Sequence, residues 1–117
     1  MFWGWQQGYK FVRIEGASSG LSGWRFHLGS TGCNGDARGN VTMCDAPNRP
    51  LVELTMNDLT RPIIVDLAAL VSGSDLDQDQ GGAEGCMGSA SDPECEALFD
   101  TVGLTAGTTQ TFFWIGE

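Results

Sequence analysis

The side chains with the most distinctive chemistry in this 117-residue chain are one histidine and four cysteines. His27 is the only imidazole, and imidazole is a common ligand for transition metals. The cysteines, Cys33, Cys44, Cys86 and Cys95, contain no CxxC pair, and their spacing does not fit a zinc finger or ribbon. Because a lone histidine on a strand is often only a packed or exposed polar residue, His27 is a candidate ligand with a structural alternative.

The four cysteines are expected to form disulfides, for which three pairings are open. We favour Cys33–Cys44 and Cys86–Cys95, because each pair closes a short glycine-rich loop. Each closure removes about 2.5–3 kcal/mol of unfolded-state chain entropy. Stable disulfides indicate an oxidising compartment, so the protein is predicted to function outside the cytoplasm.

Alternating carboxylates form a second candidate site. The run DLDQD places Asp75, Asp77 and Asp79 as in the first half of a calcium loop, where alternate carboxylates converge on the ion. The EF-hand pattern then fails, since Gln80 stands where glycine is needed and Cys86 stands where a bidentate glutamate is needed. These three aspartates are therefore a calcium candidate, with a solvated acidic turn as the alternative.

The chain carries few residues suited to catalysis. One histidine, one lysine and four cysteines expected to be oxidised indicate neither a serine triad nor a thiol nucleophile. No GxxxxGK phosphate loop is present. We therefore predict that the protein is not an enzyme; a hydrolase with an acidic pair is the alternative, although no pair stands out.

Composition and charge narrow the class further. Apolar residues make up 41% and charged residues 18%, with seventeen glycines, which favours one glycine-rich β domain with many turns. The net charge is −9, from 15 acidic and 6 basic residues. Such a surface repels phosphate backbones and anionic lipid headgroups, so no nucleic-acid partner and no membrane binding are expected. No apolar run approaches the roughly 20 residues of a membrane-spanning helix.

Alternation of apolar with polar residues predicts the strands. The first two form an antiparallel hairpin, with Trp24, Phe26 and Leu28 on one face and Arg25 and His27 on the other. A fourth apolar run is expected to end in a helical turn. The predicted strands are 9–14, 23–29, 51–56 and 109–115, and the fourth apolar run is 63–70.

The remaining chain is predicted to be loop, with one helix. Residues 29–50 and 72–91 are rich in glycine and polar residues. Asp92 as N-cap, Pro93 at the first helical position and Gly103 at the end predict a short helix reaching Thr101. The fold class is thus mainly β: an antiparallel, sandwich-like domain with one short helix and two local disulfides.

Three motifs in order resemble the MbnP family. They are WxWxxGYKF near the start, HLGSTGC ending at Cys33, and GCM followed by DPEC ending at Cys95. The family comprises secreted or periplasmic bacterial proteins with a four-cysteine motif, typically encoded beside a di-haem MauG-like peroxidase. The resemblance covers essentially the whole chain and implies a single MbnP-like domain over 1–117.

The resemblance also implies a function. Its members are expected to bind copper in a β-rich domain, and the partner peroxidase is expected to oxidise a tryptophan to kynurenine. His27 matches the family's histidine before the first cysteine, and Trp3 or Trp5 matches its tryptophan pair, although both indoles could simply be packing residues. Imidazole suits copper, which agrees with this assignment.

The family pattern also includes an N-terminal half with an export signal, early strands and a second histidine. This chain begins after that half, so it is expected to be the C-terminal portion, without those strands. The rival interpretation is a structural or adhesive cell-surface β domain, steadied by calcium at Asp75, Asp77 and Asp79.

Overall fold

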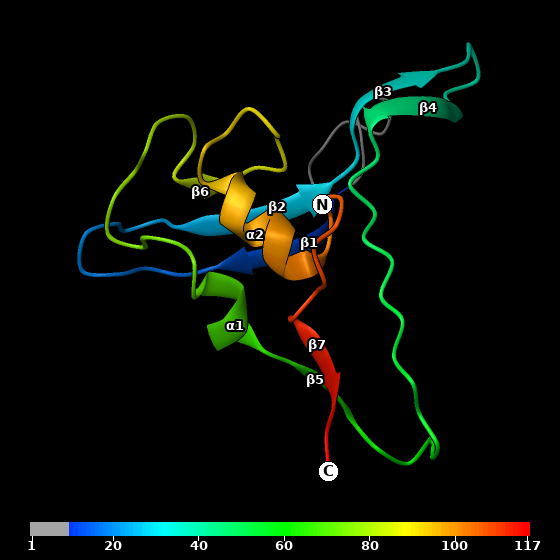
Figure 1. Ribbon diagram of the computed structural model, residues 1–117. Coiled ribbons are helices and arrows are strands. Elements are labelled where there is room, and N and C mark those ends of the chain that lie inside the picture. Colours follow the sequence, from blue (N-terminus) through cyan, green and yellow to red (C-terminus); the bar gives the residue numbers. More distant parts are fainter. Residues whose placement is uncertain (1–9) are drawn as a thin grey trace.

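The computed structural model describes residues 10–117, which form seven short strands and two helices (Figure 1). One apolar core lies mainly between β2, β6 and the two helices. The mainly-β fold class is confirmed. The strands lie in three small sheets, with orders β1-β2-β6, β3-β4 and β5-β7. In chain order the elements are β1 (Lys10–Glu15), β2 (Arg25–Gly29), β3 (Thr31–Gly35), β4 (Val41–Ala46), β5 (Ile63–Val65), α1 (Leu67–Val71), β6 (Gly85–Cys86), α2 (Cys95–Val102) and β7 (Phe113–Ile115).

The β1–β2 hairpin is the base of the core and was predicted correctly. Its strands pair antiparallel, with Ile14 opposite Phe26. Phe26 and Leu28 are fully buried because they point from β2 towards the helices, and Trp24 shares their cluster. The turn closes on a hydrogen bond from Gly16 N–H to Trp24 C=O.

Helix α2 covers this core face and contacts α1 (Figure 1). Its inward residues, Leu98 and Val102, are buried beside Leu70 of α1. The helix begins at Cys95, slightly later than predicted, because the carboxylate of Asp92 caps the preceding turn by accepting from Glu94 N–H. It ends where predicted, since Gly103 adopts a left-handed φ of 77° that favours glycine.

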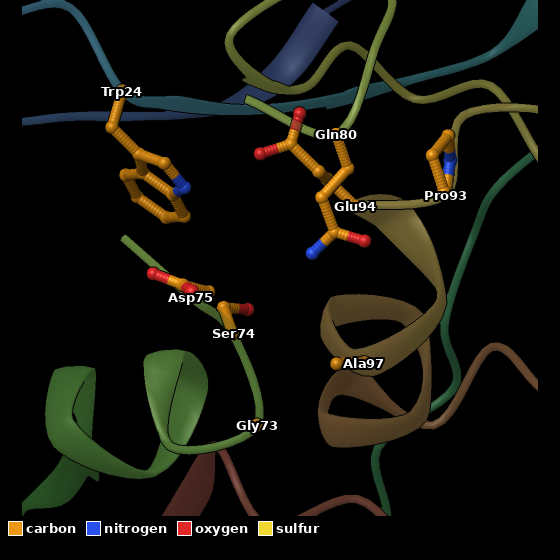
Figure 2. A pocket seen from close by; sticks show the side chains of 8 residues that line it. All are labelled: Trp24, Gly73, Ser74, Asp75, Gln80, Pro93, Glu94 and Ala97. Carbon is orange, nitrogen blue, oxygen red and sulfur yellow. The ribbon is translucent and has the colours of Figure 1, made fainter. Parts of the chain in front are cut away.

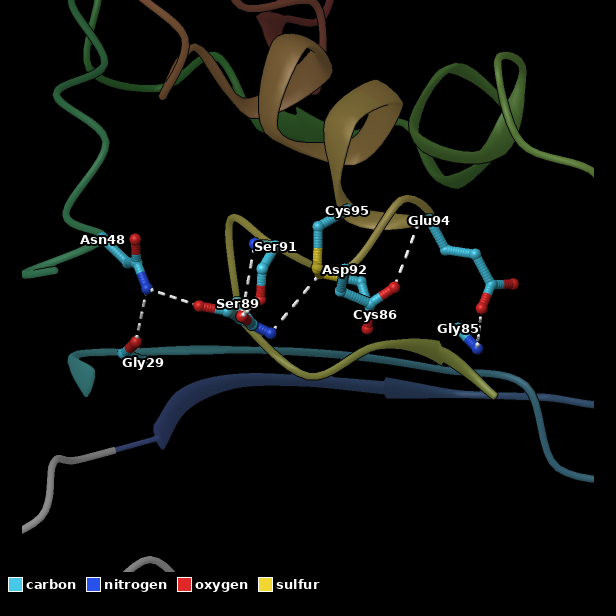
Figure 3. The surroundings of a disulfide bond; sticks show 10 residues. Gly29, Asn48, Gly85, Cys86, Ser89, Ser91, Asp92, Glu94 and Cys95 are labelled. Carbon is cyan, nitrogen blue, oxygen red and sulfur yellow. Dashed lines mark hydrogen bonds between the residues drawn. A yellow bond between two sulfur atoms is a disulfide. The ribbon is translucent and has the colours of Figure 1, made fainter. Parts of the chain in front are cut away.

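Both predicted disulfides are present. Cys86–Cys95 joins β6 to the first residue of α2, and both cysteines are buried in the core (Figure 3). Strand β6 pairs parallel with β2, an arrangement that the antiparallel prediction did not include. Asn48 ties the same region together by donating to Gly29 C=O and Gly88 C=O.

The prediction of a loop over 29–50 was wrong, because this stretch contains the β3–β4 hairpin, which projects from the body of the molecule (Figure 1). Cys33 lies directly opposite Cys44 in its ladder, so the disulfide fixes the register. Asp36 organises the turn by accepting from Arg38 N–H and Asn40 N–H. The disulfide and the Asp36 hydrogen bonds thus stabilise a hairpin whose polar residues have a low β propensity.

The predicted strand at 51–56 is also wrong. Its alternate residues are partly buried as in a strand, yet no ladder includes it, and it runs as extended chain towards β5 (Figure 1). The predicted run at 63–70 divides into β5 and α1, because the Asp66 carboxylate accepts from Ala69 N–H and starts the helix. The last strand begins at Phe113, since the Gln110 side chain bonds both backbone groups of Phe113 and forms a turn. Within 10–117, neither helix is long and apolar enough to cross a membrane.

The two disulfides should differ in their contribution to stability. They close loops of similar length, with sequence separations of 11 and 9, so each should contribute about 2.5–3 kcal/mol through chain entropy. Replacing both cysteines of the buried Cys86–Cys95 pair with alanine should cost about 1 kcal/mol or more beyond that, because a gap remains in the core. Urea unfolding of this variant and of the matched Cys33→Ala/Cys44→Ala variant measures the difference. An equal loss, or a larger loss for the hairpin pair, would contradict this view of the core.

Candidate metal-binding site around His27

His27 lies on the face of β2 that points away from the helices, because it alternates with Phe26 and Leu28. It sits directly opposite Arg13 of β1 and is only 6% exposed. A buried imidazole needs hydrogen-bond partners for its ring nitrogens. Strand β1 supplies them.

Both nitrogens of His27 are engaged. Nδ1 lies 2.9 Å from Lys10 Nζ, and Nε2 lies 2.6 Å from Glu15 Oε1. A lysine ammonium can only donate, so Nδ1 accepts and Nε2 carries the proton that it donates to Glu15. The other oxygen of Glu15 accepts from Arg13 at 2.6 Å. The four side chains form one charged row across the hairpin.

A β-bulge makes this row continuous. The register of β1 shifts between Lys10 and Val12, so that Lys10 faces Gly29 of β2. Without that shift, strict alternation would point Lys10 to the opposite face from Arg13. The bulge therefore brings the lysine to the imidazole.

The surrounding charges set the protonation states. Hydrogen bonds from Arg13 and then from His27 lower the pKa of Glu15 to about 2. Burial lowers the pKa of His27, and the nearby Lys10 charge acts in the same direction, while the hydrogen bond to Glu15 opposes both. The imidazole is therefore neutral at neutral pH, which is the form that binds a metal.

The arrangement fits part of a metal site. Metal-binding histidines commonly donate their second ring N–H to a carboxylate, as His27 does to Glu15. The lone-pair nitrogen is Nδ1, so an incoming metal ion would have to displace Lys10. Within residues 10–117 no group of three or more histidine, cysteine, aspartate or glutamate side chains could hold a metal. Trp3 and Trp5 lie outside the described residues, so the predicted neighbourhood of His27 with these indoles stays a prediction.

The three aspartates of the predicted calcium loop have local structural roles. Asp75 and Asp79 each accept a backbone N–H two residues further along the chain. The Asp77 carboxylate accepts from Ser19 Oγ and Gly20 N–H, which fastens the β1–β2 turn to the acidic loop. Gly20 approaches Asp77 so closely that a side chain there would collide with its backbone. The structure does not gather the three carboxylates into one group, and calcium binding by this trio stays a prediction.

An open groove lies on the other face of the hairpin. It has a volume of about 400 Å³ and is lined chiefly by apolar side chains, including Phe11, Phe26, Val52 and Phe112. The His27 row borders none of it. This groove therefore adds no polar donor to the candidate site.

Taken together, the fold and the histidine row define a small, disulfide-bonded β domain with one buried, carboxylate-oriented imidazole. Comparison with known proteins shows the family to which this domain belongs. The sequence profile of the MbnP family matches residues 1–88, well over half of the chain, and the chain belongs to this family.

A solved structure, MbnP from Methylosinus trichosporium, is similar, with a TM-score of 0.76 and 28% sequence identity. The match covers 97% of this chain and 48% of that one, so this chain spans about half the length of its structural relative. No curated protein sequence matches the chain closely enough to count.

Sequence reasoning identified His27 but missed its partners. Arg13 and Glu15 could have been found, because they alternate on β1 and a hairpin with 23–29 places them beside the histidine. Lys10 could not, since its position depends on the bulge.

The contribution of Glu15 to stability should depend on pH. Its pKa is lowered in the folded protein, so its bonds to Arg13 and His27 stabilise the fold above the usual pKa near 4.5. That contribution should be lost as the pH falls towards about 2. Glu15→Gln should therefore lower the melting temperature at pH 7, and the two proteins should converge in acid.

Melting curves between pH 7 and pH 2 measure this effect. The control is Glu53→Gln, an exposed glutamate with no side-chain hydrogen bond in the described structure, which should melt like wild type at every pH. A pH-independent difference for Glu15→Gln would mean that its role is packing alone.

Proposed function

We propose that this chain is part of an exported bacterial copper-binding protein of the MbnP family, and that it is the substrate of a di-haem MauG-like peroxidase. Membership of the family supports a methanobactin-associated role and a link to a partner protein. In this proposal the chain is an accessory protein without catalytic activity of its own. The two disulfides support a compartment outside the cytoplasm, either the periplasm or the extracellular space.

The observation that carries the copper proposal is the state of His27. The ring is buried, its pKa is lowered, and Glu15 fixes the tautomer that leaves a lone pair on Nδ1. Neutral imidazole suits copper, and in the structure that lone pair accepts a hydrogen bond from the ammonium of Lys10. Copper can therefore compete for Nδ1, with its other ligands coming from outside the described residues.

Burial and the family match together nominate the tryptophan that the peroxidase would oxidise. Trp24 is 5% exposed and packed in the core, whereas Trp114 is 47% exposed but lies beyond the residues matched by the family. Trp3 and Trp5 are thus the proposed substrates and copper neighbours. The reaction breaks the C2–C3 bond of the indole, adds oxygen to both carbons and releases C2 as formate. Two equivalents of hydrogen peroxide supply the two oxygen atoms and are reduced to water, and one water molecule then hydrolyses the formyl group that leaves as formate.

Copper affinity should depend on His27. His27→Ala should weaken copper binding at least tenfold while the circular dichroism spectrum stays unchanged, because this ring faces away from the helix-covered core. The matched control is Lys10→Met, which alters the same row but leaves the imidazole and frees Nδ1, so it should bind copper at least as tightly as wild type. Competition titrations with a copper chelator measure both. If His27→Ala keeps full affinity, the structural or adhesive β-domain interpretation gains instead.

Peroxidase treatment should modify one of the two early indoles. Incubation with the di-haem partner and peroxide, followed by peptide mass spectrometry, should find kynurenine at Trp3 or Trp5. The double variant Trp3→Phe/Trp5→Phe should remain unmodified, with Trp114→Phe as the control that reacts like wild type. Kynurenine at the buried Trp24 would contradict the argument from burial, and kynurenine at Trp114 would contradict the assignment from the family match.

A further inference from the structure

A small, partly open pocket lies between the start of α2 and the acidic loop (Figure 2). Its volume is about 30 Å³, enough for one water molecule or one small ion. Trp24 forms one side, and the side chains of Ser74, Asp75, Gln80 and Glu94 surround the rest. Polar side chains from three separate segments thus line the same space.

Glu94 is the most unusual of these groups. It is 6% exposed, and its Oε2 accepts a hydrogen bond of 3.2 Å from Gly85 N–H (Figure 3). Its Oε1 is buried and has no hydrogen-bond partner, and the same is true of Ser74 Oγ. Buried polar atoms normally have partners, so two unpartnered oxygens that line one pocket indicate that a water molecule or an ion binds there.

The charges around the cavity select a cation. None of the residues that line it is basic, while Asp75 and Glu94 are both acidic. Burial raises the pKa of Glu94, and the charges of Asp92 and Asp79 raise it further, while the backbone N–H groups of Gly85 and Gln80 oppose this shift. A positive ion would relieve this repulsion and satisfy the free oxygens.

We propose that this cavity is a calcium site, formed by the Glu94 and Asp75 carboxylates, the Ser74 hydroxyl and the Gln80 amide oxygen. Calcium prefers oxygen ligands of this mixed kind and tolerates irregular geometry, whereas magnesium demands a near-ideal octahedron. The site differs from the calcium loop expected from sequence, because it uses Glu94 and leaves out Asp77 and Asp79. It is also independent of copper at His27.

The position of the site suggests what calcium would do. Ser74 and Asp75 follow α1, Gln80 belongs to the acidic loop, and Glu94 immediately precedes α2. An ion bound among them would fasten the acidic loop to both helices. Extracellular calcium modules of this kind bind with dissociation constants of about 0.1–1 mM, so the ion would stabilise the fold in a calcium-rich medium.

Isothermal titration with calcium chloride, paired with melting curves, tests the proposal on the full chain. Wild type should bind one ion per chain in the range of about 0.1–1 mM and melt higher with calcium. Glu94→Gln should weaken binding at least tenfold and should still fold, because glutamine can accept from Gly85 N–H and carries no buried charge. Asp75→Asn should also weaken binding at least tenfold.

The matched control is Asp77→Asn, which keeps an oxygen for Ser19 and Gly20 and should bind calcium like wild type. Magnesium chloride should produce a much smaller rise in melting temperature. If wild type shows neither heat nor stabilisation with calcium, the cavity holds only water and the proposal fails. Loss of binding in Asp77→Asn with full binding in Glu94→Gln would move calcium to the surface loop and overturn the cavity site.

Discussion

The disulfide between Cys86 and Cys95 fixes the junction at which the sheet and the helices of this domain meet. One cysteine pairs through its strand with β2, and the other is the first residue of α2. The bond therefore holds α2 over Phe26 and Leu28, and it brings Glu94 to the backbone of Gly85. The strands and helices of this domain are short. The disulfide therefore holds them in place, as long hydrogen-bonded ladders do in larger sheets.

The opposite face of the same hairpin carries His27 and the charged side chains of the candidate site. Because side chains alternate along β2, the residues that anchor the core also present His27 to the charged row of β1. Burial and the Lys10 charge keep the imidazole neutral, while Glu15 holds its proton on Nε2. A stable core and a buried, neutral imidazole thus follow from one alternating pattern.

Sequence reasoning predicted the parts that depend on local patterns. The hairpin, α2 with its closing Gly103 and both disulfides follow from alternation, capping residues and loop lengths. It failed where distant contacts decide: the 51–56 stretch alternates correctly but has no ladder partner, and the β3–β4 hairpin forms from polar residues held by Cys33–Cys44. In the candidate site, His27 was visible as the lone imidazole. The role of Lys10 depends on a β-bulge, and the role of Glu94 depends on a cavity. Neither feature produces a periodic pattern in the sequence.

The central claim is that His27 binds copper, and X-ray absorption spectroscopy of the copper-loaded chain tests it most directly. The chain contains one histidine, so imidazole scattering around copper can come only from His27. The account predicts one imidazole in the first coordination shell of the ion. A shell of oxygen or sulfur ligands without imidazole would contradict it.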